Sequence, residues 1–167
     1  MEADMSHGDC KNSFGDSKLE LTNLQKDGIA AKLENNPVVK FVGIELLEVS
    51  VGHAILKLPL REEFHNSMGL TQGGILGVLA DVAGGVSLYS VLADPSKVVI
   101  PTIEFKLNFL RPARQEAIIA RGQVKHHGRQ IAVCQVDIST MEETLLATGV
   151  FTYMIKNVER TYVVNGK

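Results

Sequence analysis

The longest hydrophobic stretch of the chain, residues 73–93, is apolar on every face when it is drawn as a helix. A helix that is apolar all round is a buried one, so the pattern predicts a long central helix. Segments on both sides of it are rich in β-branched residues or alternate apolar with polar positions, which is typical of half-buried strands. The predicted strands are 38–50, 52–60, 98–110, 115–127, 129–140 and 145–155. Strands before and after one helix predict an α+β fold, with the helix packed on an antiparallel sheet.

The strand predicted directly after the helix alternates with a period of two, so its two faces should differ. We expect the apolar set to face the core and the polar set to face solvent. The apolar set is Ile103, Phe105, Leu107 and Phe109, and the polar set is Glu104, Lys106 and Asn108. Turn-forming residues at 51–53, 94–97, 127–129 and 141–144 separate the predicted elements.

The polarity of the chain predicts three regions. Residues 1–28 are polar and of mixed charge and are predicted to be a flexible tail, with a short helical piece around 19–26. Residues 29–156 form the predicted domain, and a length of 167 residues suits a single core. The domain opens with a helix at 29–35, which Asn35-Asn36-Pro37 ends because the residue before a proline disfavours helix. Residues 157–167 are a C-terminal extension.

One acid interrupts the apolar helix. Asp81 shares a narrow stripe with Gly74, Gly77 and Gly84, because these positions recur at the helical period. A carboxylate buried there should have a raised pKa unless it is paired or hydrogen-bonded. The glycines leave the helix backbone beside Asp81 uncovered by side chains, which allows two interpretations. Either a ligand approaches this face closely, or another helix packs on it and a backbone group satisfies Asp81.

The residues around this helix resemble a known family. The motif Asn66-x-x-Gly69-x-x-Gln72-Gly73-Gly74, followed by Asp81, is similar to the signature of the hotdog-fold acyl-CoA thioesterases of the phenylacetate-degradation (PaaI-like) type. The run 102–113 is similar to the next strand of that family, and the resemblance extends over 38–155. It implies a hotdog fold, a long central helix wrapped by a curved antiparallel sheet. The family usually has His where this chain has Gln72.

The resemblance implies thioester hydrolysis, and two groups suit that reaction. The N–H of Gly73 lies at a helix N-terminus, where unpaired donors and a partial positive charge can polarise a carbonyl. Asp81 can act as general base or nucleophile. The two are about 12 Å apart along the helix axis, which is too far for both to touch one carbonyl. A second copy of the chain would bring them together, and the resemblance likewise implies a homo-oligomer, a dimer or a dimer of dimers, with the site between protomers.

Further site residues follow from the matched positions. Thr102 matches the residue that holds the attacking water, and Asn66 matches the loop residue that orients substrate or acid. Gln72 can donate a hydrogen bond to the carbonyl but cannot act as an acid at neutral pH. Substrate contacts are expected from Gly74, Met68 and Arg111, the last as a partner for the phosphates of coenzyme A. The plainer alternatives remain open, namely that Asn66 with Gly69 only forms a turn and that Thr102 is an ordinary strand residue.

Charge and composition narrow the range of partners. A net charge of −2 argues against nucleic acid or an anionic membrane surface as a general partner. The two cysteines, Cys10 and Cys134, give neither a disulfide framework nor metal-ligand spacing, which suits a reducing cytoplasm. No secretory signal is evident at the N-terminus. Asp81 and the glycines argue against a membrane span at 73–93, and no metal or cofactor is expected.

Two other functions compete with acyl-CoA hydrolysis. One is a non-catalytic module that binds acyl-CoA or an acyl carrier, with Gln72 marking lost chemistry. The other is a hotdog hydratase or dehydratase. That chemistry generally needs a His for proton transfer, and the central motif has none at the matching position.

Overall fold

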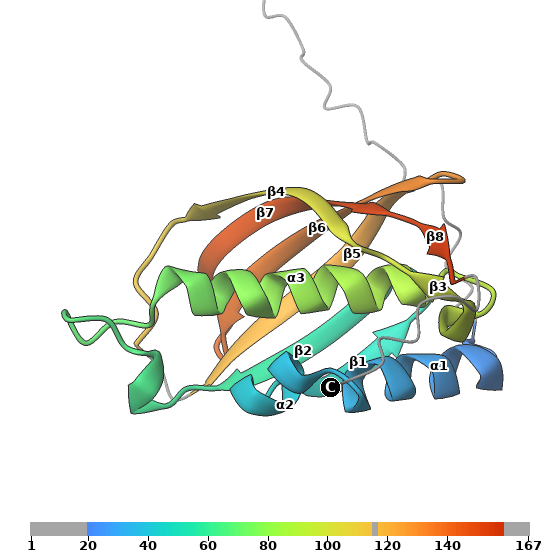
Figure 1. The fold of residues 1–167 in the computed structure, drawn as a ribbon. Coiled ribbons are helices and arrows are strands. Elements are labelled where there is room, and N and C mark those ends of the chain that lie inside the picture. The colour runs from blue at the N-terminus through green and yellow to red at the C-terminus, as the bar shows by residue number, and fades with distance from the viewer. Residues whose placement is uncertain (1–19, 115–116, 159–167) are drawn as a thin grey trace, which may run out of the picture.

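The computed structural model describes residues 20–114 and 117–158, and it confirms the predicted α+β hotdog fold. The long helix α3 (Gly73–Tyr89) lies across the inner face of a curved, six-stranded antiparallel sheet (Figure 1). The strand order is β1-β2-β5-β6-β7-β4. The bounds are β1 Glu45–Ser50, β2 His53–Pro59, β4 Thr102–Phe109, β5 Ala117–His127, β6 Ile131–Thr140 and β7 Leu145–Met154. Two short strands, β3 (Val98–Val99) and β8 (Lys156–Asn157), pair with each other.

The core lies between α3 and the sheet. Alternate residues of β2, β6 and β7 are buried there, as the strand pattern predicts. The helix contributes Leu76, Leu79, Ala83 and Leu88, all buried. None of the helices in the described parts of the chain is long and apolar enough to cross a membrane.

The segment Pro37–Val42 is a helix, α2, so the strand prediction for 38–50 is wrong over its first part. Asn36 caps this helix, because its Oδ1 accepts hydrogen bonds from the N–H groups of Val38 and Val39. Pro37 occupies the first helical position, where its missing N–H does no harm. Gly43 ends the helix with a φ of 82°. These capping residues outweigh the β-preference of the valines between them.

Helix α1 (Asn23–Glu34) begins within the segment predicted to be a tail. Thr22 and Gln25 form a capping box at its start. The Gln25 side chain also donates to the carbonyls of Ser90 and Leu92, at 3.0 and 3.1 Å. These bonds tie α1 to the end of α3, so the predicted boundary at residue 28 falls inside a helix. The rest of the predicted tail, residues 1–19, and residues 159–167 of the predicted extension lie outside the described residues.

Strand β4 forms one edge of the sheet and is less buried than its sequence pattern predicts. Phe105 faces the helix layer, because its ring stacks on buried Phe151 with centroids 5.0 Å apart. Even so, Ile103, Phe105 and Phe109 are 49%, 53% and 56% exposed. The prediction that these residues are in the core is therefore wrong for a single chain, since nothing within the described chain covers this edge.

Candidate active site

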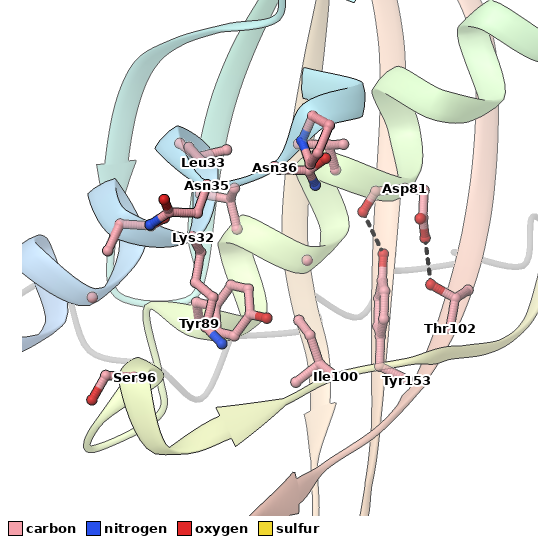
Figure 2. A pocket seen from close by; sticks show the side chains of 16 residues that line it. Lys32, Leu33, Asn35, Asn36, Asp81, Tyr89, Ser96, Ile100, Thr102 and Tyr153 are labelled. Atoms are coloured by element: carbon pink, nitrogen blue, oxygen red, sulfur yellow. Dashed lines mark hydrogen bonds between the residues drawn. The ribbon is translucent and has the colours of Figure 1, made fainter. Parts of the chain in front are cut away.

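The Asp81 side chain points toward the start of β4, where Thr102 meets it. The Thr102 hydroxyl donates a 2.7 Å hydrogen bond to Oδ1 of Asp81 (Figure 2). Asp81 is half-buried in the single chain and not enclosed in the core as predicted. The helix stripe thus places a carboxylate at the surface of a pocket, with a hydroxyl held against it.

Tyr153 is a member of this group that the sequence analysis missed. Its hydroxyl donates a 2.8 Å hydrogen bond to the backbone carbonyl of Asp81. Burial raises the pKa of Tyr153 well above its usual value, with the nearby Asp81 as a second cause. Gly84 makes room for it, because a Cβ at position 84 would overlap the Tyr153 hydroxyl. One feature of the sequence could have indicated Tyr153. It is an aromatic residue with a polar hydroxyl at the last inward-facing position of β7.

A pocket of about 570 Å³ opens beside Asp81 and Thr102. It lies between α1, the start of α2, the second half of α3 and the segment before β4. Val82, Val86 and Ile100 line it with apolar side chains, and Asn35 and Asn36 line it with polar ones. Tyr89 lines the pocket as well.

The second predicted group lies at the N-terminal end of α3, whereas Asp81 lies near the middle of that helix. Gly73 is the first residue of the helix, and no acceptor among the described residues takes its N–H. A Cβ at position 73 would lie 3.1 Å from the ring of Phe109, so the exposed β4 side chain borders this N–H. Gln72 is the N-cap residue and is exposed, and its side chain makes no capping hydrogen bond. Both groups are therefore free to contact a ligand.

Asn66 organises the loop before the helix. Its Oδ1 accepts hydrogen bonds from the N–H groups of Met68 and Leu70, at 2.9 and 3.2 Å. Gly69 has a φ of 70°, a conformation that favours glycine. The turn-forming alternative for Asn66 and Gly69 is thus observed, while the carboxamide NH₂ of Asn66 has no partner in the described structure.

The remaining predicted contacts are on the surface and apart from Asp81. Met68 is 73% exposed. Gly74 faces open space, since a Cβ there would meet nothing within 4 Å. Arg111 is exposed and donates to the carbonyl of Leu145 at 2.8 Å. Asp81 and Gly73 are separated by about two turns of one helix, about 12 Å, so a single chain presents two half-sites.

Within the described ranges, no group of three His, Cys, Asp or Glu residues is placed to hold a metal ion. Cys134 is buried and unpaired, and Cys10 lies outside the described residues. Among the described residues, the carboxylate pocket and the helix N-terminus are the features that bear on the predicted chemistry.

Comparison with known proteins shows what the chain is similar to. The family model described as the thioesterase superfamily matches residues 68–147, which include Gly73, Asp81 and Thr102 but neither Asn66 nor Tyr153. The acyl-coenzyme A thioesterase PaaI of Escherichia coli is 25% identical over 118 residues, 70% of this chain and 81% of that protein. The chain resembles the hotdog thioesterases of the PaaI type. The resemblance inferred from the motifs is therefore confirmed, and so is the assignment as a thioester hydrolase.

The chain is also similar to further proteins. A Halobacterium salinarum protein, named only provisionally as an esterase, is 29% identical over 131 residues, 74% of this chain and 86% of its own. The solved structure of E. coli PaaI has a TM-score of 0.73 at 21% identity and covers 84% of this chain and 97% of its own. A thioesterase family protein from Silicibacter pomeroyi has a TM-score of 0.75 at 23% identity, covering 80% and 99%. At these identities the two structures support the fold alone.

Proposed function

We propose that the protein hydrolyses acyl-CoA thioesters at a site shared by two copies of the chain, with Asp81 as general base or nucleophile. The observation that carries the proposal is the hydrogen bond between Thr102 and Asp81 at the wall of a pocket. The names of two relatives support the substrate class. One is the acyl-coenzyme A thioesterase PaaI of E. coli, and the other is 1,4-dihydroxy-2-naphthoyl-CoA hydrolase of Listeria monocytogenes, 27% identical over 115 residues.

Asp81 and Thr102 supply the attacking side of the reaction. As a base, the Asp81 carboxylate takes a proton from a water molecule, whose oxygen then bonds to the thioester carbon. As a nucleophile, the carboxylate itself bonds to that carbon, and water later hydrolyses the resulting anhydride. In either route the carbon–sulfur bond breaks and CoA leaves as the thiolate. The Thr102 hydroxyl, within hydrogen-bond distance of Asp81, is placed to hold the water beside it.

Gly73 supplies the opposite side. As the carbonyl carbon is attacked, negative charge grows on its oxygen, and the unpaired N–H at the start of α3 is a preorganised donor for that charge. Gln72, beside it and exposed, adds a neutral donor from its side chain. The NH₂ of Asn66, with Met68, Gly74 and Arg111, then contacts the rest of the substrate.

Two surface features support assembly into a homodimer. The edge strand β4 presents unpaired backbone and three exposed apolar side chains, a combination that soluble proteins usually cover. Next to it, Gly74 and Gly77 leave a part of α3 bare, because a Cβ at either position would meet nothing within 4 Å. A second chain that pairs its own β4 with this edge would continue the sheet and bring its α3 close. Gly73 of one protomer would then face Asp81 of the other.

The test is a thiol-release assay with a panel of acyl-CoAs, comparing wild type with Asp81→Asn. Asparagine keeps the shape and can still accept the Thr102 hydrogen bond, so the fold should be retained. We expect wild type to release CoA and the variant to lose at least about a hundredfold in kcat. Glu48→Gln, on exposed β1 and away from the pocket, is the matched control and should keep wild-type rates. Equal rates in Asp81→Asn and wild type would remove Asp81 from the mechanism, and tight binding without release by wild type would favour the non-catalytic binding module.

A further inference from the structure

The pocket beside Asp81 has a second polar end. Figure 2 shows Asp81 and Thr102 on one side of it and Lys32, Tyr89 and Ser96 on the other. Tyr89 follows Asp81 by about two turns of α3, or about 12 Å along the axis. The α3 side chains that line the pocket between them, Val82 and Val86, are apolar, whereas Asn35 and Asn36 line it from the junction of α1 and α2. An acyl group whose thioester lies at Asp81 would therefore extend along Val82 and Val86 toward Lys32 and Tyr89.

Lys32 carries the charge at this far end. Of the described residues that line the pocket, Asp81 and Lys32 are the two with charged side chains. The Lys32 ammonium donates to the carbonyl of Val98 at 2.8 Å and lies 5.5 Å from the centre of the Tyr89 ring. No carboxylate in the described structure forms an ion pair with it. Since an ammonium has three donors, two remain for a ligand.

Tyr89 adds a neutral donor beside this ammonium. Its hydroxyl has no hydrogen-bond partner among the described residues, and it lines the same pocket. Burial raises the pKa of Tyr89 to about 12, so the hydroxyl keeps its proton at neutral pH and can donate it. Partial burial lowers the pKa of Lys32.

We propose that this thioesterase prefers acyl groups that end in a carboxylate, with Lys32 and Tyr89 binding that end. The inference rests on the proposed function and names its substrate class. A carboxylate at the far end would accept charge-assisted hydrogen bonds from Lys32 and a neutral one from Tyr89. A methyl group at the same place would displace water from the ammonium and give nothing in return, which is unfavourable.

The experiment compares matched pairs of CoA thioesters that differ only at the far end of the chain. The pairs are hexanoyl with adipoyl, octanoyl with suberoyl, and decanoyl with sebacoyl. For wild type we expect kcat/KM to favour the carboxylate-ended member of at least one pair by about tenfold or more. Lys32→Met keeps roughly the length of the side chain and removes its charge. In this variant the ratio of kcat/KM between the carboxylate-ended and the methyl-ended member of a pair should fall at least tenfold, and kcat/KM for the methyl-ended member should rise. Tyr89→Phe should reduce the preference by a smaller factor.

The control is Lys26→Met, because Lys26 lies on the same helix but is exposed and does not line the pocket. It should leave the preference as in wild type. If Lys32 only anchors α1 to the Val98 carbonyl, then Lys32→Met should lower both members of each pair in parallel. An unchanged ratio in that variant, or a wild-type preference for the methyl-ended members, would overturn the inference while leaving thioester hydrolysis intact.

Binding measurements can test the preference for a carboxylate end independently of thioester hydrolysis. Calorimetric titration of Asp81→Asn with the same pairs measures selection of the far end without turnover. Tighter binding of the carboxylate-ended members, lost on adding Lys32→Met, would support the inference even if no thioester were hydrolysed. Equal affinities within every pair would contradict it.

Discussion

At the scale of single residues, the N–H of Gly73 can be removed without disturbing the helix that presents it. Gly73 is the first helical residue, a position where proline is well tolerated. Gln72 before it is extended, with a ψ of 130°, as a residue preceding proline should be. We therefore expect Gly73→Pro to keep the fold and to lower kcat by about 10²–10³, the effect of losing one oxyanion donor. Thiol release with a saturating acyl-CoA measures it.

The matched control for that change is Gly73→Ala. Both substitutions add a Cβ that meets the Phe109 ring, but alanine keeps the N–H. If the donor matters, alanine should retain most of the rate that proline loses. Equal losses in the two variants would assign the effect to the contact with Phe109 and would exclude the N–H from the mechanism.

Site residues could be predicted where one stretch of the sequence carries the signal. They were missed where their role depends on residues far away in the sequence. Asp81 and Gly73 could be found because a lone acid and a helix start are visible in one stretch of the chain. The same stretch placed Asp81 in the core, whereas the structure leaves it half-buried. Tyr153 and Lys32 reach the pocket from β7 and α1, far from α3 in sequence. Such contacts are set by packing and not by spacing along the chain.

At the scale of elements, α3 depends on Gly84 to seat Tyr153. A Cβ at position 84 would overlap the Tyr153 hydroxyl, while one at Gly85 would meet Ile100 at an ordinary 3.5 Å. We expect Gly84→Ala to lower the free energy of unfolding by about 1–3 kcal/mol through overpacking. Gly85→Ala should leave it unchanged or raise it, because alanine favours helix over glycine by about 0.5–1 kcal/mol. Thermal denaturation of both variants at one protein concentration makes the comparison. Equal stability of the two would show that Tyr153 is not held by this contact.

Elements with strong periodic patterns were predicted well, and those governed by their ends were not. The alternation of apolar and polar residues predicted strand β2, and the apolar run predicted helix α3, and both elements are observed. Helix α3 ends at Tyr89, however, and not near residue 93. The valines of α2 favour a strand locally, but Asn36, Pro37 and Gly43 determine a helix. Pro101 lies in the gap between β3 and β4, where a single strand was predicted. Caps and prolines thus decided the boundaries that hydrophobic periodicity could not.

At the scale of the whole molecule, the exposure of β4 is the largest difference from the sequence pattern. The pattern is that of a strand with one covered face, yet Phe105 and Phe109 are more than half exposed in one chain. The two observations agree if a second copy of the chain covers this face of β4. The hydrophobic pattern of a strand reflects its burial in the assembled oligomer. The position of Gly73 at one end of α3 and Asp81 in its middle leads to the same conclusion.

A shared site predicts that two inactive variants restore each other. In a mixed dimer of Asp81→Asn and Gly73→Pro, one site contains both substitutions and the other contains neither. When the two chains are co-expressed at equal levels and pair at random, about a quarter of all sites should be intact, so about a quarter of the wild-type rate should return. Each variant expressed alone should stay near background. Activity no higher in the mixture than in either variant alone would mean that Gly73 and Asp81 do not meet across two chains. In the control, the Gly73→Pro chain is co-expressed with a chain that carries both Gly73→Pro and Asp81→Asn. No mixed dimer of these two chains contains an intact site, so no activity should return.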